Sequence, residues 1–89
     1  MPSEYKLYQN YPNPFNPSTT IKYQVKETGI VSLKIFDILG AEVTTLLNEV
    51  KNPGTYEISF DASSLTSGVY FYRIQAGSFT AVKKLLLVK

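Results

Sequence analysis

Cysteine, histidine and tryptophan are all absent from this sequence of 89 residues. Without cysteine the chain forms no disulfide and offers no thiolate chemistry. Without histidine it lacks the side chain most used for acid–base work near neutral pH and the commonest metal ligand. No apolar run approaches the ~20 residues of a membrane-spanning helix. The formal net charge of +2 gives no footprint for nucleic acid or an anionic membrane. One small domain with little stability to spare is therefore expected.

Side chains that could do chemistry are few and scattered. The acids stand singly in turns and at outward strand positions: Glu4, Glu27, Asp37, Glu42, Glu49, Glu57 and Asp61. Hydrolysis needs a nucleophile with a base, or two facing carboxylates, and neither pattern is present. Asp37 and Asp61 fall in separate turns, so they do not form the single oxygen-rich loop of a calcium site. We therefore predict that the chain is not an enzyme and holds no metal or cofactor.

Alternation of apolar and polar residues is the dominant local pattern, and it predicts strands. The segments that alternate are 19–25, 30–36, 41–47, 56–60, 69–74 and 79–88. We expect the last segment to be a strand and not a helix, because a tight turn at Ala76-Gly77 or Gly77-Ser78 precedes it and no helix cap does. Turn signals recur at roughly ten-residue intervals. That spacing predicts an all-β, immunoglobulin-like antiparallel β-sandwich of about seven strands in Greek-key order.

Two of the turns have a predicted geometry. Residues 37–40 fit a type I turn, with Asp at the first position and Gly at the fourth. Residues 52–55 fit a type II turn, which would give Gly54 a positive φ. We expect residues 48–51, just before this second turn, to form a loop.

The segment 69–74 is the predicted central strand, because aromatic and aliphatic side chains occupy both of its faces. The preceding Leu65 and Gly68, followed by Tyr70, resemble the tyrosine corner of Greek-key sandwiches. In that corner a tyrosine hydroxyl bonds back to the preceding crossover. The alternative is that Tyr70 is a core aromatic and no more.

The N-terminal part has no clear period, and we interpret residues 1–10 as a linker remnant before a domain spanning 11–89. Residues 11–18 hold three of the five prolines, which predicts a stiff and irregular lead-in. Phe15 is the expected hydrophobic anchor of this lead-in on the body of the sandwich.

Tyrosine is abundant, with seven residues, and exposed tyrosines on a flat sheet can stack on sugar rings. Tyr23, Tyr56, Tyr70 and Tyr72 occupy positions that alternate with core aliphatic residues, which favours burial. A carbohydrate-binding or adhesive surface module nevertheless remains an alternative function.

Two stretches of the chain resemble a known family, the C-terminal sorting domains of the type IX secretion system of Bacteroidetes and related phyla. The resemblance runs from about Leu7 to Lys89. The matching motif residues are Tyr11, Pro12, Asn13, Pro14, Gly40, Leu65, Gly68 and Tyr70, together with the Asp37–Gly40 hairpin. The basic and apolar tail also matches: Lys83, Lys84, Leu85, Leu86, Leu87, Val88 and Lys89.

The resemblance implies a sorting signal without catalytic activity. The outer-membrane translocon would recognise the folded domain in the periplasm and export it with an N-terminal cargo to the cell surface or the medium. A sortase-like protease would then remove the domain. The signal peptide for the inner membrane, which the first ten residues do not resemble, would lie at the far end of a longer parent chain. A structural module like the immunoglobulin-like domains of flagellar hook-cap proteins is a rival within the same fold.

Recognition is expected at the last strand. If this strand is a sheet edge, its unpaired backbone groups invite strand addition by a partner or a weak edge-to-edge dimer. Lys83, Lys84 and Lys89 would steer that partner, or would only protect the edge from aggregation. For Gly68 and Tyr70 a structural role is favoured over recognition. Segment 11–17 is either a spacer or a boundary marker for the protease.

Overall fold

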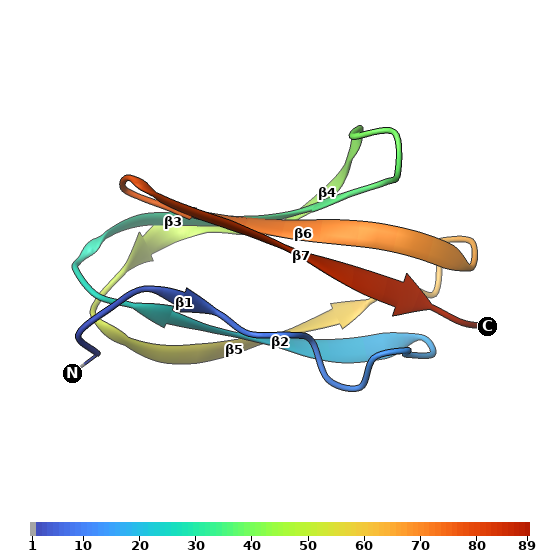
Figure 1. Cartoon of the computed structure of the whole chain (residues 1–89), viewed down its shortest axis with the longest axis horizontal. Helices are drawn as coiled ribbons and strands as arrows, with labels where there is room; N and C mark the ends of the chain where they lie inside the picture. Colours follow the sequence, from blue (N-terminus) through green and yellow to red (C-terminus); the bar gives the residue numbers. More distant parts are fainter. Residues whose placement is uncertain (1) are drawn as a thin grey trace.

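Seven strands form two facing sheets in the computed structural model, which describes residues 2–89 (Figure 1). The strands are β1 Lys6–Leu7, β2 Ser18–Val25, β3 Gly29–Phe36, β4 Glu42–Lys51, β5 Gly54–Asp61, β6 Gly68–Ala76 and β7 Phe79–Leu87. One sheet has the order β1-β2-β5 and the other β4-β3-β6-β7, and all pairs of strands are antiparallel. Across residues 2–89 no helix has the length and apolar character to cross a membrane.

The connections between the sheets give the predicted Greek-key, immunoglobulin-like arrangement. The chain crosses from one sheet to the other after β2, after β4 and after β5, so that neighbours in sequence are not always neighbours in a sheet. Strand β6 lies between β3 and β7, which confirms the segment 69–74 as a central strand. The fold class predicted from the sequence is therefore confirmed.

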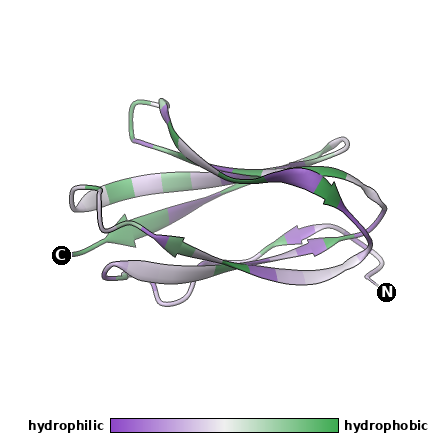
Figure 2. Cartoon of the chain, turned by 180° about the vertical axis from the view of Figure 1, so that it is seen from behind, coloured by the Kyte–Doolittle hydropathy of each residue, from purple (hydrophilic) through white to green (hydrophobic). Residues whose placement is uncertain are grey.

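Alternation explains how each strand contributes to the core. In β6 the inward side chains of Tyr70, Tyr72 and Ile74 are buried, while Phe71 and Arg73 face outward and are half-exposed. In β7 Leu85 and Leu87 are buried and the residues between and before them are more exposed. Figure 2 shows the hydropathy along β7, with a hydrophilic middle followed by a hydrophobic end at the C-terminus.

Two turns follow their sequence signals. The amide of Gly40 donates to the carbonyl of Asp37 at 3.0 Å, and the Asp37 carboxylate accepts from the amides of Leu39 and Ala41. The last hairpin turns at Gly77-Ser78, because Ala76 and Phe79 are paired. Both Gly40 and Gly77 have a positive φ, which residues other than glycine rarely adopt.

The second predicted turn is wrong in detail. Gly54 does not have a positive φ, because it already pairs with Val25 in the β2–β5 ladder and needs an extended backbone. The predicted loop at 48–51 is strand, since β4 continues to Lys51. The sequence pattern ends early because none of the residues 48–51 is buried, so this part of β4 shows no alternation of apolar and polar side chains.

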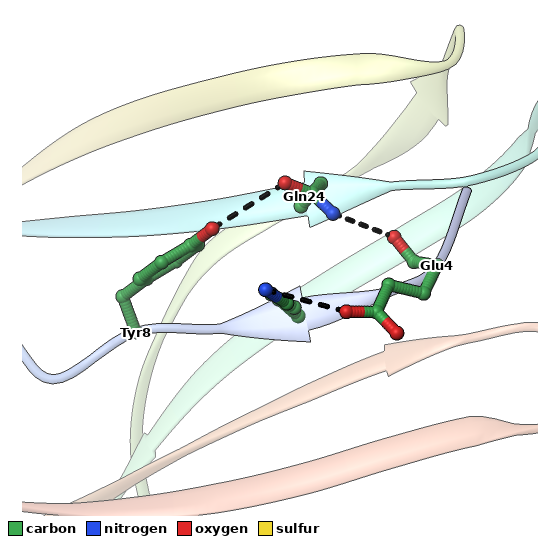
Figure 3. A network of polar contacts seen from close by, with 4 residues as sticks. Glu4, Tyr8 and Gln24 are labelled. Carbon is green, nitrogen blue, oxygen red and sulfur yellow. Dashed lines mark hydrogen bonds and ion pairs between the residues drawn. The ribbon is translucent and has the colours of Figure 1, made fainter. Parts of the chain in front are cut away.

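The N-terminal segment differs most from the prediction. Residues 1–10 were expected to be a linker, but Lys6–Leu7 form β1, Leu7 is buried, and Tyr5 stacks on Phe79 with 5.3 Å between ring centroids. Figure 3 shows polar contacts that hold this segment against β2: the Tyr8 hydroxyl donates to Gln24, and Gln24 donates to the carbonyl of Glu4. Met1 lies outside the described residues.

Candidate functional site

The basic and apolar tail of the chain occupies the second half of the edge strand β7 and the two residues that follow it. Leu85 and Leu87 are buried in the core, whereas the side chains of Lys83 and Lys84 are exposed. Because neighbouring residues of a strand point to opposite faces, these two lysines leave β7 in different directions. The tail therefore divides into residues that hold the fold and residues that a partner could contact.

The free edge of this strand is covered where the sequence predicts it to be open. The amide of Phe15 donates to the carbonyl of Leu86 at 3.0 Å, and the amide of Val88 donates to the carbonyl of Phe15 at 2.9 Å. The Leu86 amide donates to the Asn13 side chain at 2.9 Å, and the Gln9 side chain donates to the carbonyl of Lys84 at 2.7 Å. Residues 9–15, the lead-in clamp, thus occupy the outward backbone groups along the end of β7.

The clamp is anchored by one buried side chain. Phe15 is 2% exposed, and the centroid of its ring lies 6.3 Å from the centroid of the Phe60 ring. The expectation that Phe15 anchors the lead-in is therefore confirmed. The segment is also more than a stiff spacer, because it forms a short parallel bridge with Leu87.

A buried polar network connects the start of the clamp to the central strand. The Tyr72 hydroxyl donates to the carbonyl of Tyr8 at 2.6 Å and accepts from the Asn10 amide at 2.8 Å. The Asn10 side chain donates to Thr19 at 3.0 Å and to the carbonyl of Pro12 at 3.1 Å. Burial raises the pKa of Tyr72 to about 12, although the bond from the Asn10 backbone opposes this shift.

Sequence analysis did not single out Asn10 or Gln9. A polar residue that is buried because it bonds to distant partners leaves no local pattern, and Asn10 reaches a hydroxyl 62 positions away. The nearest usable signal is the absence of any period in residues 1–10, which is compatible with either a linker or a specifically bonded segment.

The tyrosine corner is present. The Tyr70 hydroxyl donates to the carbonyl of Thr66 at 2.7 Å, which ties the start of β6 to the crossover that precedes it. Leu65 is half-buried and packs against the core at the same place. Gly68 has a φ of +152°, which disfavours any other residue although nothing lies within 4 Å of an added Cβ. These observations favour a structural role for Leu65, Gly68 and Tyr70.

The other motif residues lie along the clamp. Asn13 bonds to β7, and the Pro12 carbonyl accepts from Asn10 and Thr19. Pro14 is exposed, and so is Tyr11, with 81% of its surface accessible. The structure thus brings Tyr11 to Pro14 together along the clamp, whereas Leu65, Gly68 and Tyr70 lie at the β5–β6 crossover and Gly40 lies in the hairpin after β3.

The last residue is also held. The Lys89 amide donates to the Ser67 side chain at 3.1 Å, and the Lys89 ammonium donates to the carbonyl of Ser63 at 2.7 Å. Of the three tail lysines, Lys89 therefore contacts the β5–β6 crossover, while no hydrogen bond or ion pair within residues 2–89 involves the ammonium of Lys83 or Lys84.

The structure gives little support to a carbohydrate platform. Tyr23, Tyr70 and Tyr72 are buried, as expected, and Tyr56 is half-buried with its ring stacked on Tyr23 at 5.4 Å. Tyr11 is the one tyrosine with most of its surface accessible within residues 2–89. In the same described part of the chain, no three His, Cys, Asp or Glu residues gather in a way that could hold a metal ion.

A family model described as a secretion system C-terminal sorting domain matches residues 9–89. The chain belongs to this family. The match begins at Gln9, the first residue of the lead-in clamp, and ends at Lys89, so it contains both partners of the contact described above. This confirms the assignment to the type IX sorting domains made from the sequence, and with it the role of a sorting signal.

Two solved structures share the fold. Dimeric latent PorU from Porphyromonas gingivalis matches with a TM-score of 0.72 and 21% identity, over 99% of this chain and 10% of PorU. PorZ from the same organism, described as an essential surface component of the type IX secretion system, matches with a TM-score of 0.65 and 21% identity. That match covers 93% of this chain and 11% of PorZ. No curated protein sequence matches the chain significantly.

Proposed function

We propose that this domain is a non-enzymatic sorting signal which the outer-membrane machinery of the type IX secretion system recognises in order to export a cargo. The family match over nearly the whole chain carries the proposal. In this proposal the domain travels with an N-terminal cargo through the periplasm to the cell surface or the medium. A sortase-like protease then cuts upstream of the lead-in clamp.

Within the tail, we assign recognition to the exposed side chains of Lys83, Lys84 and Val88. The buried Leu85 and Leu87 serve the core, the half-buried Leu86 serves the contact with Phe15, and Lys89 serves the contact with the crossover. Strand addition to the end of β7 is not part of this assignment, because the clamp occupies the necessary backbone groups. An edge dimer through the same end of β7 would meet the same obstacle.

Export of a fusion protein tests the proposal. Residues 1–89 are joined to the C-terminus of a periplasmic fluorescent protein, in a bacterium whose own type IX cargo is exported. We expect the fusion to reach the surface or the medium. A folded and intact fusion that stays in the periplasm would contradict the sorting role.

Charge variants test the assignment of the lysines. We expect Lys83→Gln with Lys84→Gln to lower export of the fusion by about tenfold, a loss of about 1.4 kcal/mol of recognition. Lys22→Gln with Lys26→Gln removes the same charge from β2 and the residue that follows it, and should leave export unchanged. If the tail variant aggregates while its soluble fraction is exported normally, the lysines protect the edge and are not recognised.

A further inference from the structure

The four sheet edges differ in how much of their backbone is available. Strand β1 has two residues, β4 has two register shifts, and the end of β7 is covered by the lead-in clamp. Strand β5 has eight residues in unbroken register with β2. It is therefore the longest regular edge among the described residues, and such an edge is a template for pairing with another chain.

The pairing of β2 shows which backbone groups of β5 point outward. The backbone groups of Thr20 bond to Tyr11 and the carbonyl of Lys22 bonds to Tyr8, so the even-numbered residues of β2 face β1 and the clamp. The odd-numbered residues of β2 then face β5 and bond to their partners Tyr56, Ile58 and Phe60. The amides and carbonyls of Thr55, Glu57 and Ser59 consequently point to the open edge.

None of the hydrogen bonds outside the strand ladders uses these outward groups within residues 2–89. The side chains of Thr55, Glu57 and Ser59 are all exposed on the outer face of the sheet. The edge therefore offers a row of backbone donors and acceptors that have no partner among the described residues.

A hollow lies beside this edge, between β5 and β4. It has a volume of about 350 Å³, and its lining combines the apolar residues Val43, Leu46, Phe60 and Leu65 with the polar residues Thr44, Ser59, Asp61 and Ser64. Val43, Leu46, Ile58 and Leu65 are partly buried side chains packed against the core. An added strand would place alternate side chains toward this hollow, because residues of a strand point in turn to its two faces.

Charge defines the outward side of such a strand. Glu57 and Asp61 are the charged residues of β5, and both are exposed acids. Glu57 stands opposite Lys22 of β2 on the outer face, and Asp61 lines the hollow at the end of the strand. Two copies of β5 paired with each other would bring these acids together, and like charges opposite one another destabilise a sheet. A basic partner strand would be stabilised at the same positions.

We propose that the edge of β5 is a docking site for an extended segment of another protein, in which aliphatic residues alternate with lysine or arginine. The backbone of the segment pairs with Thr55, Glu57 and Ser59. Its aliphatic side chains lie against the apolar part of the hollow at Val43 and Leu46, and its basic side chains lie beside Glu57 and Asp61. The site is distinct from the C-terminal tail, so it does not depend on the proposed sorting function.

A synthetic peptide provides the test. The probe is an acetylated and amidated peptide of about nine residues, the length of an ordinary strand, in which valine alternates with lysine. We expect it to shift the NMR amide signals of Thr55, Glu57 and Ser59, and not those of β7. A matched peptide with glutamate in place of lysine should bind about tenfold more weakly or worse.

Proline variants separate strand addition from plain charge attraction. Ser59→Pro removes an outward amide without touching the bonds to β2, and proline is tolerated on an edge with this orientation. Val82→Pro removes the corresponding outward amide in β7. We expect Ser59→Pro to weaken the peptide by about tenfold and Val82→Pro to leave its affinity unchanged.

The folded state of each variant is checked from its own amide spectrum. Should Ser59→Pro unfold the domain, the double variant Glu57→Gln with Asp61→Gln replaces it. This variant is expected to bind the lysine peptide more weakly and the glutamate peptide more tightly than the unchanged domain does. Equal binding to Ser59→Pro and to the unchanged domain would overturn the proposal. So would amide shifts confined to β7, an absence of binding, or a dimer of the domain formed through β5.

Discussion

The strand edges on the two long sides of the sandwich are covered to different extents. On the side of β1 and β7, Tyr5 stacks on Phe79 and the lead-in clamp covers the end of the last strand. On the side of β4 and β5, the outward backbone groups of β5 have no partner among the described residues, and a hollow of about 350 Å³ lies between the two strands. One side is closed by the chain itself, and the other is left for solvent or a partner.

On the closed side, the N-terminal lead-in and the C-terminal strand contact each other. Gln9 bonds to Lys84 across 75 positions of sequence, and Asn13 bonds to Leu86 across 73. Because these bonds join opposite ends of the sequence, the lead-in clamp and the end of β7 are held together only in the folded domain. The closed side thereby couples the C-terminal tail to the integrity of the whole sandwich.

Removing the anchor of the closed side should have the largest effect. Phe15→Ala deletes a ring that is 2% exposed, and truncating a buried phenylalanine costs about 3–5 kcal/mol of unfolding free energy. For a domain with a total stability of about 5–15 kcal/mol, the variant is expected to be marginally folded. Urea unfolding followed by circular dichroism measures the change. A loss below about 1 kcal/mol would show that the lead-in is not part of the cooperative fold.

The buried network of the clamp predicts the next largest effect. Tyr72→Phe leaves the Asn10 amide and the Tyr8 carbonyl without their partner, and unsatisfied buried groups cost about 1–3 kcal/mol. Comparing the unfolding midpoints of the two proteins at neutral pH gives this value. Stability unchanged within about 0.5 kcal/mol would mean that water replaces the hydroxyl and that the network does not hold the clamp.

The same residue makes stability depend on pH. The folded state holds the Tyr72 proton up to a pKa of about 12, above the usual value of 10.0, so the unfolded state loses it first. The free energy of unfolding therefore falls as the pH rises from about 10 to about 12, by as much as about 2.7 kcal/mol. Below about pH 10 this contribution is fully present. Tyr72→Phe removes only this titrating group, so the free energy of unfolding of the variant should fall less steeply between about pH 10 and pH 12. Equal slopes for the two proteins would contradict the raised pKa of Tyr72.

The central strands were predictable because burial gives them a period. The alternation around Tyr72 and Leu33 is visible in any short window, and the Leu65, Gly68 and Tyr70 spacing predicts the corner that the Tyr70 hydroxyl makes. The strand β1 and the clamp were not predictable by the same means. Two residues cannot show a period, and a bond from Asn13 to Leu86 depends on how distant segments meet.

On the open side, truncation of a core-facing residue should cost less. Leu46 is half-buried beside the hollow, so Leu46→Ala removes fewer contacts than Phe15→Ala and is expected to cost about 1–2 kcal/mol. The measurement is the same urea titration. A cost equal to that of Phe15→Ala would indicate that the two sides stabilise the fold alike, and the contrast between them would fail.

The smallest expected effect concerns the single hydrogen bond between the Asn13 side chain and the Leu86 amide. Asn13 is exposed, and its side chain accepts a hydrogen bond from the Leu86 amide at 2.9 Å, so Asn13→Ala should cost about 1 kcal/mol or less in global stability. Its effect on local protection should be clearer, because the Leu86 amide loses the one protein acceptor it has on the closed side. Hydrogen exchange followed by NMR is expected to show faster exchange at Leu86, with the amides of β5 unchanged. Since the outward amides of Thr55, Glu57 and Ser59 have no such cover, they should exchange fast in both proteins. Slow exchange at those three positions would show that the open side is closed in solution, which would remove the structural contrast between the two edges.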